Sequence, residues 1–426
     1  MRFKIHTKRQ YVKSLLQTIL GATLASVLML GTSLHAKSSI ISPLPLPQEK
    51  ILDIDEHACG DGCLKKLYIN GYIFSFLAKF TPGTADKKLL QYFSEAMAQL
   101  NGAEVQISSD KAHFKVALLI PKQLVGRYSV SVANTILAYL ITRNIDFDFQ
   151  VFDCVDESRE NIESGYMRVI QSNADFVIAM LGPVGTEHLI AYENLIYPTY
   201  IPTINKERLS PELLAKLPGN LYFGGISYKE QFETLLPLIK GEPIVEYTDD
   251  SQIGSYLSML FASFNQPISR KRTLTSQEAS QFSKTLSSEE TYFADAALIL
   301  NTAAPKTGLI LSQIELSEES PKVYLSTQIN FNPIILQLAS PKSRENLFVV
   351  SSIGTIDTAL MEYAFLLNND LRYDWVSYAT SIGVEFGLKM ITKDGRSLFG
   401  EGMQDQQIRY QNRLWTTQGS NFVLAK

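Results

Sequence analysis

This 426-residue chain has few residues with the types and spacing that covalent catalysis requires. Beyond the N-terminal segment the histidines, His57, His113 and His188, are far apart in the sequence. No Gly-x-Ser-x-Gly elbow, Walker A loop or Gly-x-Gly-x-x-Gly turn follows a predicted strand. Carboxylate pairs such as Asp249-Asp250 are typical of loops and helix caps. The sequence therefore predicts a binding protein without catalytic residues, a metal or a cofactor.

Residues that could bind a ligand are expected where predicted strands end. Gly185 and Thr186 follow one strand and begin a helix, so backbone N–H groups and the Thr186 hydroxyl could hold a carboxylate. Alternatively, Thr186 only caps that helix. Arg127 and Tyr128 follow an earlier strand, and Asn205 follows a later one. Because parallel strands end at one edge of a sheet, these residues are candidates for a single ligand site.

The elements that would position these residues alternate between strands and helices. Short apolar runs predict buried strands at Lys115–Pro121, Phe147–Asp153, Asp175–Leu181 and Thr199–Asn205. Helices are expected between them, at Arg127–Arg143, Ser158–Gln171 and Gly185–Ile196. Strands that alternate with helices of this length predict right-handed crossovers and a parallel, doubly wound α/β sheet.

A second series of the same kind predicts a second lobe. Its strands are expected at 220–227, 243–247, 268–274, 296–301, 323–328 and 347–351, and its helices at 229–239, 251–264, 277–285, 306–314 and 357–367. The two series together predict two Rossmann-like lobes with a cleft between them. Tyr228 and Tyr324 either line that cleft from the second lobe or pack in its core. Alternating segments at 397–403 and 408–415 predict a C-terminal β-hairpin on the edge of one lobe.

The N-terminus has the layout of a secretory signal peptide. A basic start precedes the apolar run Leu15–Leu30, and a small residue, Ala36, follows it. We therefore expect residues 1–36 to direct export across the inner membrane of a Gram-negative bacterium, with a protein in the periplasm as the result. An uncleaved anchor is the alternative, because the apolar run is nearly long enough to span a bilayer.

The remaining chain divides by composition. Residues 37–50 are rich in Ser and Pro and predict a linker, and 51–112 predict a helical N-terminal element. The first lobe is expected at 113–206 and the second at 207–426, with the chain crossing between lobes near 330–370. Removing the five basic residues of the signal changes the net charge from −4 to −9. That charge argues against nucleic acid or an anionic membrane surface as a partner.

Two of the three cysteines are close in sequence. Cys59 and Cys63 enclose Gly-Asp-Gly, a spacing that favours a tight disulfide in an oxidising compartment. Free thiols and a metal site are the alternatives, although Zn²⁺ needs about four ligands and His57 alone is nearby. Cys154 follows a strand and is expected to be a small buried residue.

Several of these segments carry a family resemblance. KVALLIP, QVFD, DFVIAMLGP and YIPTIN together resemble the type I periplasmic-binding-protein fold of the Leu/Ile/Val-binding-protein kind, over about residues 115–420. The resemblance implies two Rossmann-like lobes, a hinge and an interlobe ligand cleft. Residues 295–314, 322–327, 372–384 and 400–419 look like the closing part of the penicillin-binding-protein activator branch.

The departures from that family shape the functional expectation. Amino-acid receptors of this fold carry small residues where this chain has Arg127 and Tyr128, and more than the one hydroxyl of Thr186 in the third loop. We therefore expect a non-enzymatic accessory protein that acts through envelope protein partners, in cell-wall synthesis or in an envelope machine such as the flagellar motor. The alternative is a receptor for a small anionic or amide solute, contacted by Thr186 and Asn205 and attracted by Arg127, that feeds a transporter.

Overall fold

The computed structural model describes residues 59–81, 86–100, 113–126, 128–392 and 395–425. The predicted signal peptide and linker lie outside these residues, and so does Arg127. Within the described ranges, no helix combines the length and the apolar character needed to cross a membrane. The chain divides into two compact units, residues 1–108 and 109–426.

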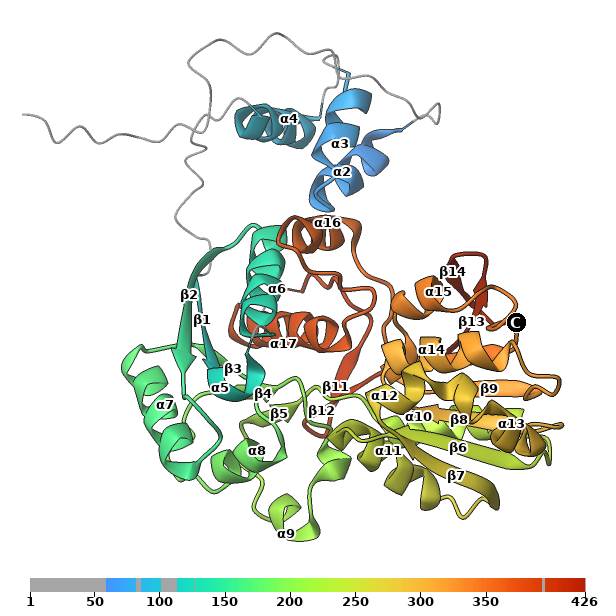
Figure 1. Ribbon diagram of the computed structural model, residues 1–426. Helices are drawn as coiled ribbons and strands as arrows, with labels where there is room; N and C mark the ends of the chain where they lie inside the picture. Colours follow the sequence, from blue (N-terminus) through green and yellow to red (C-terminus); the bar gives the residue numbers. More distant parts are fainter. Residues whose placement is uncertain (1–58, 82–85, 101–112, 127, 393–394, 426) are drawn as a thin grey trace, which may run out of the picture. The chain divides into compact units, whose positions relative to one another are not determined.

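The N-terminal unit is helical, as expected for part of 51–112. It contains α2 (Asp61–Ile69), α3 (Ile73–Lys79) and α4 (Lys87–Leu100), drawn in blue in Figure 1. A small apolar core holds them together, and in it the rings of Tyr68 and Tyr92 stack with their centroids 4.0 Å apart. Cys59 and Cys63 form a disulfide at the start of α2. The predicted pairing of these two cysteines is confirmed.

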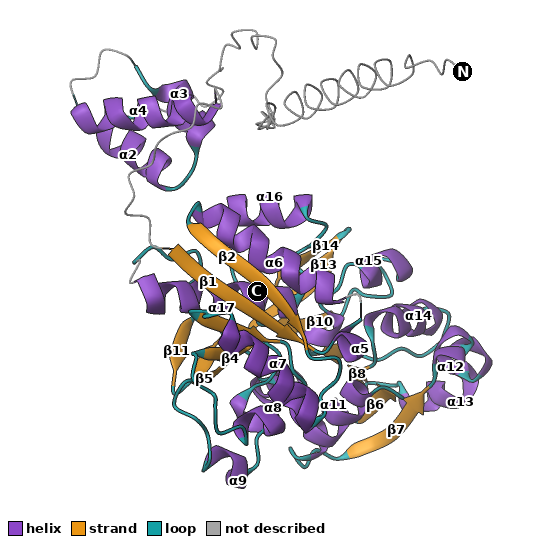
Figure 2. Cartoon of the chain, turned by 90° about the vertical axis from the view of Figure 1, so that its left-hand side faces the viewer, coloured by secondary structure: helices purple, strands orange, loops and turns teal. Residues whose placement is uncertain are grey.

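The first lobe of the larger unit is built on a seven-stranded sheet. Its first five strands along the chain are all parallel: β1 (His113–Ile120), β2 (Asp146–Asp153), β3 (Phe176–Ala179), β4 (Thr199–Ile201) and β5 (Leu221–Phe223). Two helices, α6 (Tyr128–Arg143) and α17 (Trp375–Thr392), pack on one face. Two others, α7 (Arg159–Gln171) and α8 (Pro183–Ile190), cover the opposite face (Figure 2). The two short helices are α5 (Lys122–Val125) and α9 (Pro211–Leu214).

The second lobe repeats this plan. Its parallel strands are β6 (Ile244–Asp249), β7 (Ile268–Leu274), β8 (Ala297–Asn301), β9 (Val323–Ser326) and β10 (Leu347–Ser351). One face of the sheet is covered by α12 (Ser276–Ser280), α14 (Ala304–Ile314) and α15 (Ile334–Leu338), with α13 (Leu286–Glu289) nearby. The other face is covered by α10 (Tyr228–Leu235) and α11 (Gln252–Ala262).

The two sheets share one strand order. It runs β5-β4-β3-β1-β2 in the first sheet and β10-β9-β8-β6-β7 in the second. Central strands such as β3 and β8 are buried along their whole length, which explains their continuous apolar sequences. β2 and β7 are edge strands on which half-buried and exposed residues alternate. The prediction of a buried strand at Phe147–Asp153 was therefore wrong in burial, because this strand pairs on one side with β1.

The C-terminal tail contributes a hairpin to each sheet. β11 (Gly402–Gln404) and β12 (Gln407–Arg409) join the first sheet, where β12 lies beside β5. β13 (Arg413–Gln418) and β14 (Asn421–Leu424) join the second, where β13 pairs antiparallel with β10. We had expected one hairpin on one lobe. The turn at Asp405 and Gln406, both with positive φ, lies in the predicted gap between the two segments, but the second strand ends at Arg409 and the chain then enters the other sheet.

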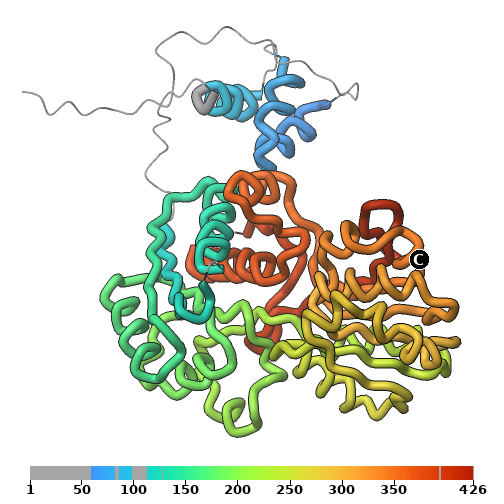
Figure 3. Tube along the Cα trace, in the orientation of Figure 1, coloured from blue at the N-terminus to red at the C-terminus, as the bar shows by residue number. Residues whose placement is uncertain are grey.

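The chain passes between the lobes three times within the described part of this unit. The crossing segments are 224–227, 352–357 and 410–412 (Figure 3). The first lobe therefore extends past residue 206, where we had placed its end, since β5 still belongs to its sheet. The helices that follow the second crossing, α16 (Thr358–Leu366) and α17, return to the first lobe and pack against α6.

Glycines allow α17 to approach the first sheet closely. A Cβ on Gly383 would lie 2.1 Å from the ring of Tyr200 on β4. One on Gly387 would lie 2.4 Å from the ring of Phe176 on β3. The Tyr200 hydroxyl donates a hydrogen bond to the carbonyl of Ala379 at 2.9 Å, which fixes the helix in place. The close packing of α17 on β3 and β4 therefore requires glycine at these two positions.

Gly383→Ala tests this packing. Alanine favours a helix by about 1 kcal/mol over glycine, but the added methyl must displace Tyr200. We expect the substitution to lower the free energy of unfolding by about 1–3 kcal/mol, the usual cost of overpacking a core. Thermal and urea denaturation would measure it. Gly400→Ala is the matched control, because Gly400 is exposed with open space around it. Equal stability of the two variants would contradict the close approach.

Candidate functional site

The shared strand order places a topological switch point in each lobe. It falls between β1 and β3 in the first sheet and between β6 and β8 in the second, where successive connections leave in opposite directions. In open α/β sheets ligands bind outside the carboxyl ends of the strands at such points. The helices that begin there are α8 and α14.

An internal carboxylate occupies the N-terminus of α8. Glu157, from the loop between β2 and α7, accepts hydrogen bonds from the backbone N–H groups of Gly182 and Gly185, the latter at 3.1 Å. A Cβ on either glycine would lie about as close, 3.1 and 2.9 Å, to atoms of that carboxylate. The Glu157 carbonyl also accepts a hydrogen bond from Nδ1 of His188 at 2.7 Å. The predicted anion site therefore exists, and the anion is part of the chain.

Thr186 does not face a ligand in this arrangement. Its side chain is fully buried, and its hydroxyl donates to the carbonyl of Gly182 at 2.8 Å, one helical turn back. The hydroxyl therefore does not cap the helix, and it is not available to a ligand in the cleft. Both interpretations of Thr186 made from the sequence were thus incorrect, because Glu157 performs the capping.

The second lobe has an equivalent arrangement at α14. The Asp249 carboxylate, 1 % exposed, accepts from the backbone N–H of Ala303 at 2.8 Å and from Ser251. Lys306, on α14, lies 3.9 Å from Asp249 and 2.5 Å from the exposed Asp250. Asp249 is therefore a buried cap and only Asp250 is a solvated loop residue. In both lobes the helix N-terminus at the switch point already holds a carboxylate of the protein.

Asn205 has a structural role at the first crossing. Its Nδ2 donates to the carbonyl of Gly225 at 2.9 Å, and its Oδ1 accepts from the N–H of Glu207 at 2.9 Å. The side chain is 7 % exposed. Both polar ends are thus used within the protein, and they tie the loop after β4 to the segment that crosses between the lobes.

The other sequence candidates do not form one site. Tyr228 is buried at the start of α10, where it packs edge-on against Tyr256. Tyr324 is buried within β9, and burial raises the pKa of both Tyr228 and Tyr324 above its ordinary value. Tyr128 begins α6 and is 50 % exposed. The two buried tyrosines therefore pack in the second lobe, and Tyr128 stays a candidate at the first strand-end loop.

A pocket that the sequence did not reveal lies where the lobes meet, beside the second crossing. Its volume is about 240 Å³, and we call it the aromatic pocket. It is lined by Phe331, Tyr373, Trp415 and Phe422, by Ile353, Ile356 and Met361, and by Gly354 and Arg372. Phe331 lies at the centre of the aromatic wall of the pocket. Its ring centroid is 4.8 Å from that of Phe422, 5.1 Å from that of Trp415 and 5.3 Å from that of Tyr373.

Both lobes and the crossing segment build the aromatic pocket. Met361, Arg372 and Tyr373 come from α16 and the turn after it, which belong to the first lobe. Phe331 and Trp415 come from the second lobe. A molecule bound in this pocket would therefore touch both lobes. The lining residues are spread over about ninety positions, and no local pattern in the sequence connects them.

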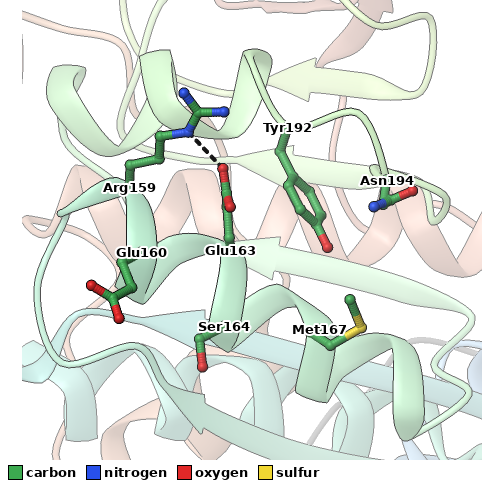
Figure 4. A pocket seen from close by; sticks show the side chains of 7 residues that line it. All are labelled: Arg159, Glu160, Glu163, Ser164, Met167, Tyr192 and Asn194. Atoms are coloured by element: carbon green, nitrogen blue, oxygen red, sulfur yellow. Dashed lines mark hydrogen bonds and ion pairs between the residues drawn. The ribbon is translucent and has the colours of Figure 1, made fainter.

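A second, wider depression lies on the first lobe alone. It has a volume of about 640 Å³ and runs between α7 and the loop after α8 (Figure 4). Arg159 and Glu163, one turn apart on α7, pair at 2.7 Å along one side of it, and Figure 4 shows Tyr192 directed toward Met167. Because its lining residues come from one lobe, a ligand there would not bridge the lobes.

The two lobes, their shared strand order and the three crossings define the two-lobed fold of type I periplasmic binding proteins. Among solved structures, the chain is similar to a putative branched-chain amino acid ABC transporter protein from Rhodospirillum rubrum, with a TM-score of 0.54 and 10% identity over 74% of this chain and 100% of that one. It is similar to a branched-chain amino acid ABC transporter protein from Thermus thermophilus with bound valine (TM-score 0.51, 13% identity, 74% and 96% covered).

A third similar structure is an ABC transporter solute-binding protein from R. palustris in complex with 4-hydroxybenzoate (TM-score 0.51, 10% identity, 74% and 96% covered). No protein-family model and no curated protein matches the chain. The fold expected from the sequence is confirmed. The expectation of an accessory protein that acts through envelope partners is wrong, because the structural neighbours are ABC transporter proteins, one with bound valine and one a solute-binding protein in complex with 4-hydroxybenzoate.

Glu157→Ala tests the internal carboxylate. Loss of the side chain leaves two N–H groups without their charged acceptor, so we expect the free energy of unfolding to fall by about 1–3 kcal/mol. Added acetate should restore part of the loss in the variant and leave the wild type unchanged, since the vacated site would accept a free carboxylate. Glu160→Ala is the control, because Glu160 is an exposed carboxylate on the adjoining helix. A Glu157→Ala protein as stable as the control would contradict the capping role.

Proposed function

We propose that this protein is a non-enzymatic receptor that binds a small organic solute between its lobes and delivers it to a membrane transporter. The observation that carries the proposal is a pocket of about 240 Å³ built by both lobes and a crossing segment. A solute held there makes contacts that depend on how the lobes are arranged. That dependence is the physical requirement for a receptor whose partner distinguishes loaded from empty forms.

The comparisons support the receptor class at the level of fold. One neighbour is an ABC transporter protein with bound valine and another is a solute-binding protein with bound 4-hydroxybenzoate, and both ligands are small organic acids. Their identities to this chain are 10–13%, so the ligand is argued from this chain's own residues. The closeness to the penicillin-binding-protein activator branch concerns the closing part of the second lobe and stays a prediction.

The proposed receptor works outside the cytoplasm. The N-terminal layout predicts export to the periplasm, and the Cys59–Cys63 disulfide fits an oxidising compartment. The site proposed from the sequence, with Thr186 and Asn205 as ligand contacts, is replaced by the aromatic pocket. Both of those side chains have their hydrogen bonds within the protein.

A solute screen by thermal shift tests the proposal. A solute present at about 100 times its dissociation constant adds about 2.7 kcal/mol of stability, which raises Tm by several degrees in a chain of this size. We expect at least one small organic acid to do so. If no member of a library of amino acids, aliphatic acids, aromatic acids and amides raises Tm, the receptor role would be contradicted.

A second readout separates receptor behaviour from passive binding. Cysteines replacing the exposed Glu160 in the first lobe and Gln277 in the second would carry a fluorophore pair, since Cys154 is buried. We expect the solute to change energy transfer between them. A pair at Glu160 and Glu187, both in the first lobe, is the control and should not change. An unchanged interlobe signal with a bound solute would show that the lobes do not respond.

A further inference from the structure

We infer that the aromatic pocket binds a small aromatic monocarboxylate, with its ring among Phe331, Trp415 and Phe422 and its carboxylate on Arg372. The inference rests on the receptor function proposed above and names the chemical class of its solute.

The volume of the pocket sets the size of the ligand. An apolar cavity of about 150 Å³ is large enough to bind benzene. The aromatic pocket, at about 240 Å³, has room for one such ring with a carboxylate and one further small group. Disaccharides and nucleotides are too large for it.

The lining selects an aromatic group. The rings of Tyr373, Trp415 and Phe422 lie 4.8 to 5.3 Å from that of Phe331, all tilted by 43° to 46°. Aromatic pairs at 4.5–7 Å in offset or edge-on geometry contribute beyond the apolar area that they bury. The ring of a bound ligand would contact the edges or faces of several of these side chains. Gly354 lines the pocket with backbone alone. A side chain does not fit at this position, because its Cβ would lie 2.6 Å from Glu401 and from the Tyr378 hydroxyl.

The charge of the lining selects an anion. Arg372 is the charged residue among the described lining residues, and its side chain is 55 % exposed at the rim. Asp370 accepts from its Nε at 3.1 Å and from its Nη2 at 3.3 Å, which holds the guanidinium in one orientation. Since a guanidinium has five N–H donors, some remain for a ligand. Asp370 occupies the Nε–Nη2 side, so a flat monocarboxylate would form its two parallel hydrogen bonds with the Nη1–Nη2 side.

The rest of the interlobe region supports this choice. At both switch points a carboxylate of the protein, Glu157 or Asp249, already holds the helix N-terminus that would otherwise attract a ligand anion. The indole N–H of Trp415 has no hydrogen-bond partner among the described residues. Arg372 is therefore the cation at the rim that an acid in the aromatic pocket would pair with, although Arg413 also lies near the wall, with its Nη1 3.3 Å from the position of a Cβ on Gly354.

Titration calorimetry of the full chain with benzoate, and with benzamide as its uncharged counterpart, tests the inference. We expect one benzoate per chain and binding at least about tenfold tighter than benzamide, the range of a charge-assisted hydrogen bond. Arg372→Gln should remove that difference by weakening benzoate alone. Met361→Trp should abolish binding of both by filling the pocket. Phe365→Trp, at an exposed position on the same helix, is the control and should leave both unchanged.

Fluorescence locates the ligand independently. The chain has two tryptophans, Trp375 and Trp415. We expect benzoate to change the emission of wild type and Trp375→Phe, and not that of Trp415→Phe. Circular dichroism would confirm that each variant is folded.

The outcomes separate this inference from the receptor proposal. If benzoate does not bind while another solute stabilises the protein, the aromatic-acid assignment falls and the receptor proposal stands. If benzoate binds with equal affinity to wild type, Arg372→Gln and Met361→Trp, the pocket is the wrong site. If nothing in the library binds, both fall.

Discussion

At the first crossing between the lobes, residues 224–227, the chain passes through a space that is too narrow for side chains at Gly224 and Gly225. Where the chain leaves the first sheet, a Cβ on Gly224 would lie 1.7 Å from the Tyr200 hydroxyl, and one on Gly225 would lie 2.2 Å from the carbonyl carbon of Ile204. Substitution at either glycine would push β4 and the crossing segment apart. Because Tyr200 also holds α17 through Ala379, the crossing and the helix layer of the first lobe share one anchor.

Hydrogen bonds then join this passage to the third crossing. The carbonyl of Gly224 accepts from the Tyr410 hydroxyl at 2.5 Å, and that of Gly225 accepts from Asn205 and from Gln407 at 2.9 and 3.0 Å. Motion between the lobes must therefore keep these two segments together and bend around them. The aromatic pocket is built partly from the remaining, second crossing. This second crossing is itself joined to the third, since the Ser352 hydroxyl donates to Asn412 Oδ1 at 2.8 Å. A ligand in the pocket would therefore contact a set of crossing segments that are bonded to one another, which places solute binding and lobe motion in the same part of the structure.

The sequence allowed the α/β class, two lobes and most strands to be predicted, because central parallel strands are buried on both faces and therefore read as apolar runs. It did not reveal α17, whose residues Ser377–Gly383 are all buried, so that no polar face marks a helical period. The site was harder still. Glu157 meets Gly182 across 25 positions and a strand, and the pocket residues Phe331 and Phe422 meet only after the tail has added its second hairpin. Such pairings depend on tertiary packing, and local spacing does not encode them.

The third cysteine has a consequence for how this chain acquires its disulfide. Cys154 is 1 % exposed and packs so tightly on Gly165 that a Cβ there would lie 2.7 Å from its own. Burial raises the pKa of its thiol to about 12, and thiol–disulfide exchange proceeds through the thiolate. Once the first sheet has formed, Cys59 and Cys63 have only each other to react with. An unpaired third cysteine can form wrong disulfides during oxidative folding. In the folded protein, burial of the Cys154 thiol prevents this although Cys154 has no disulfide partner.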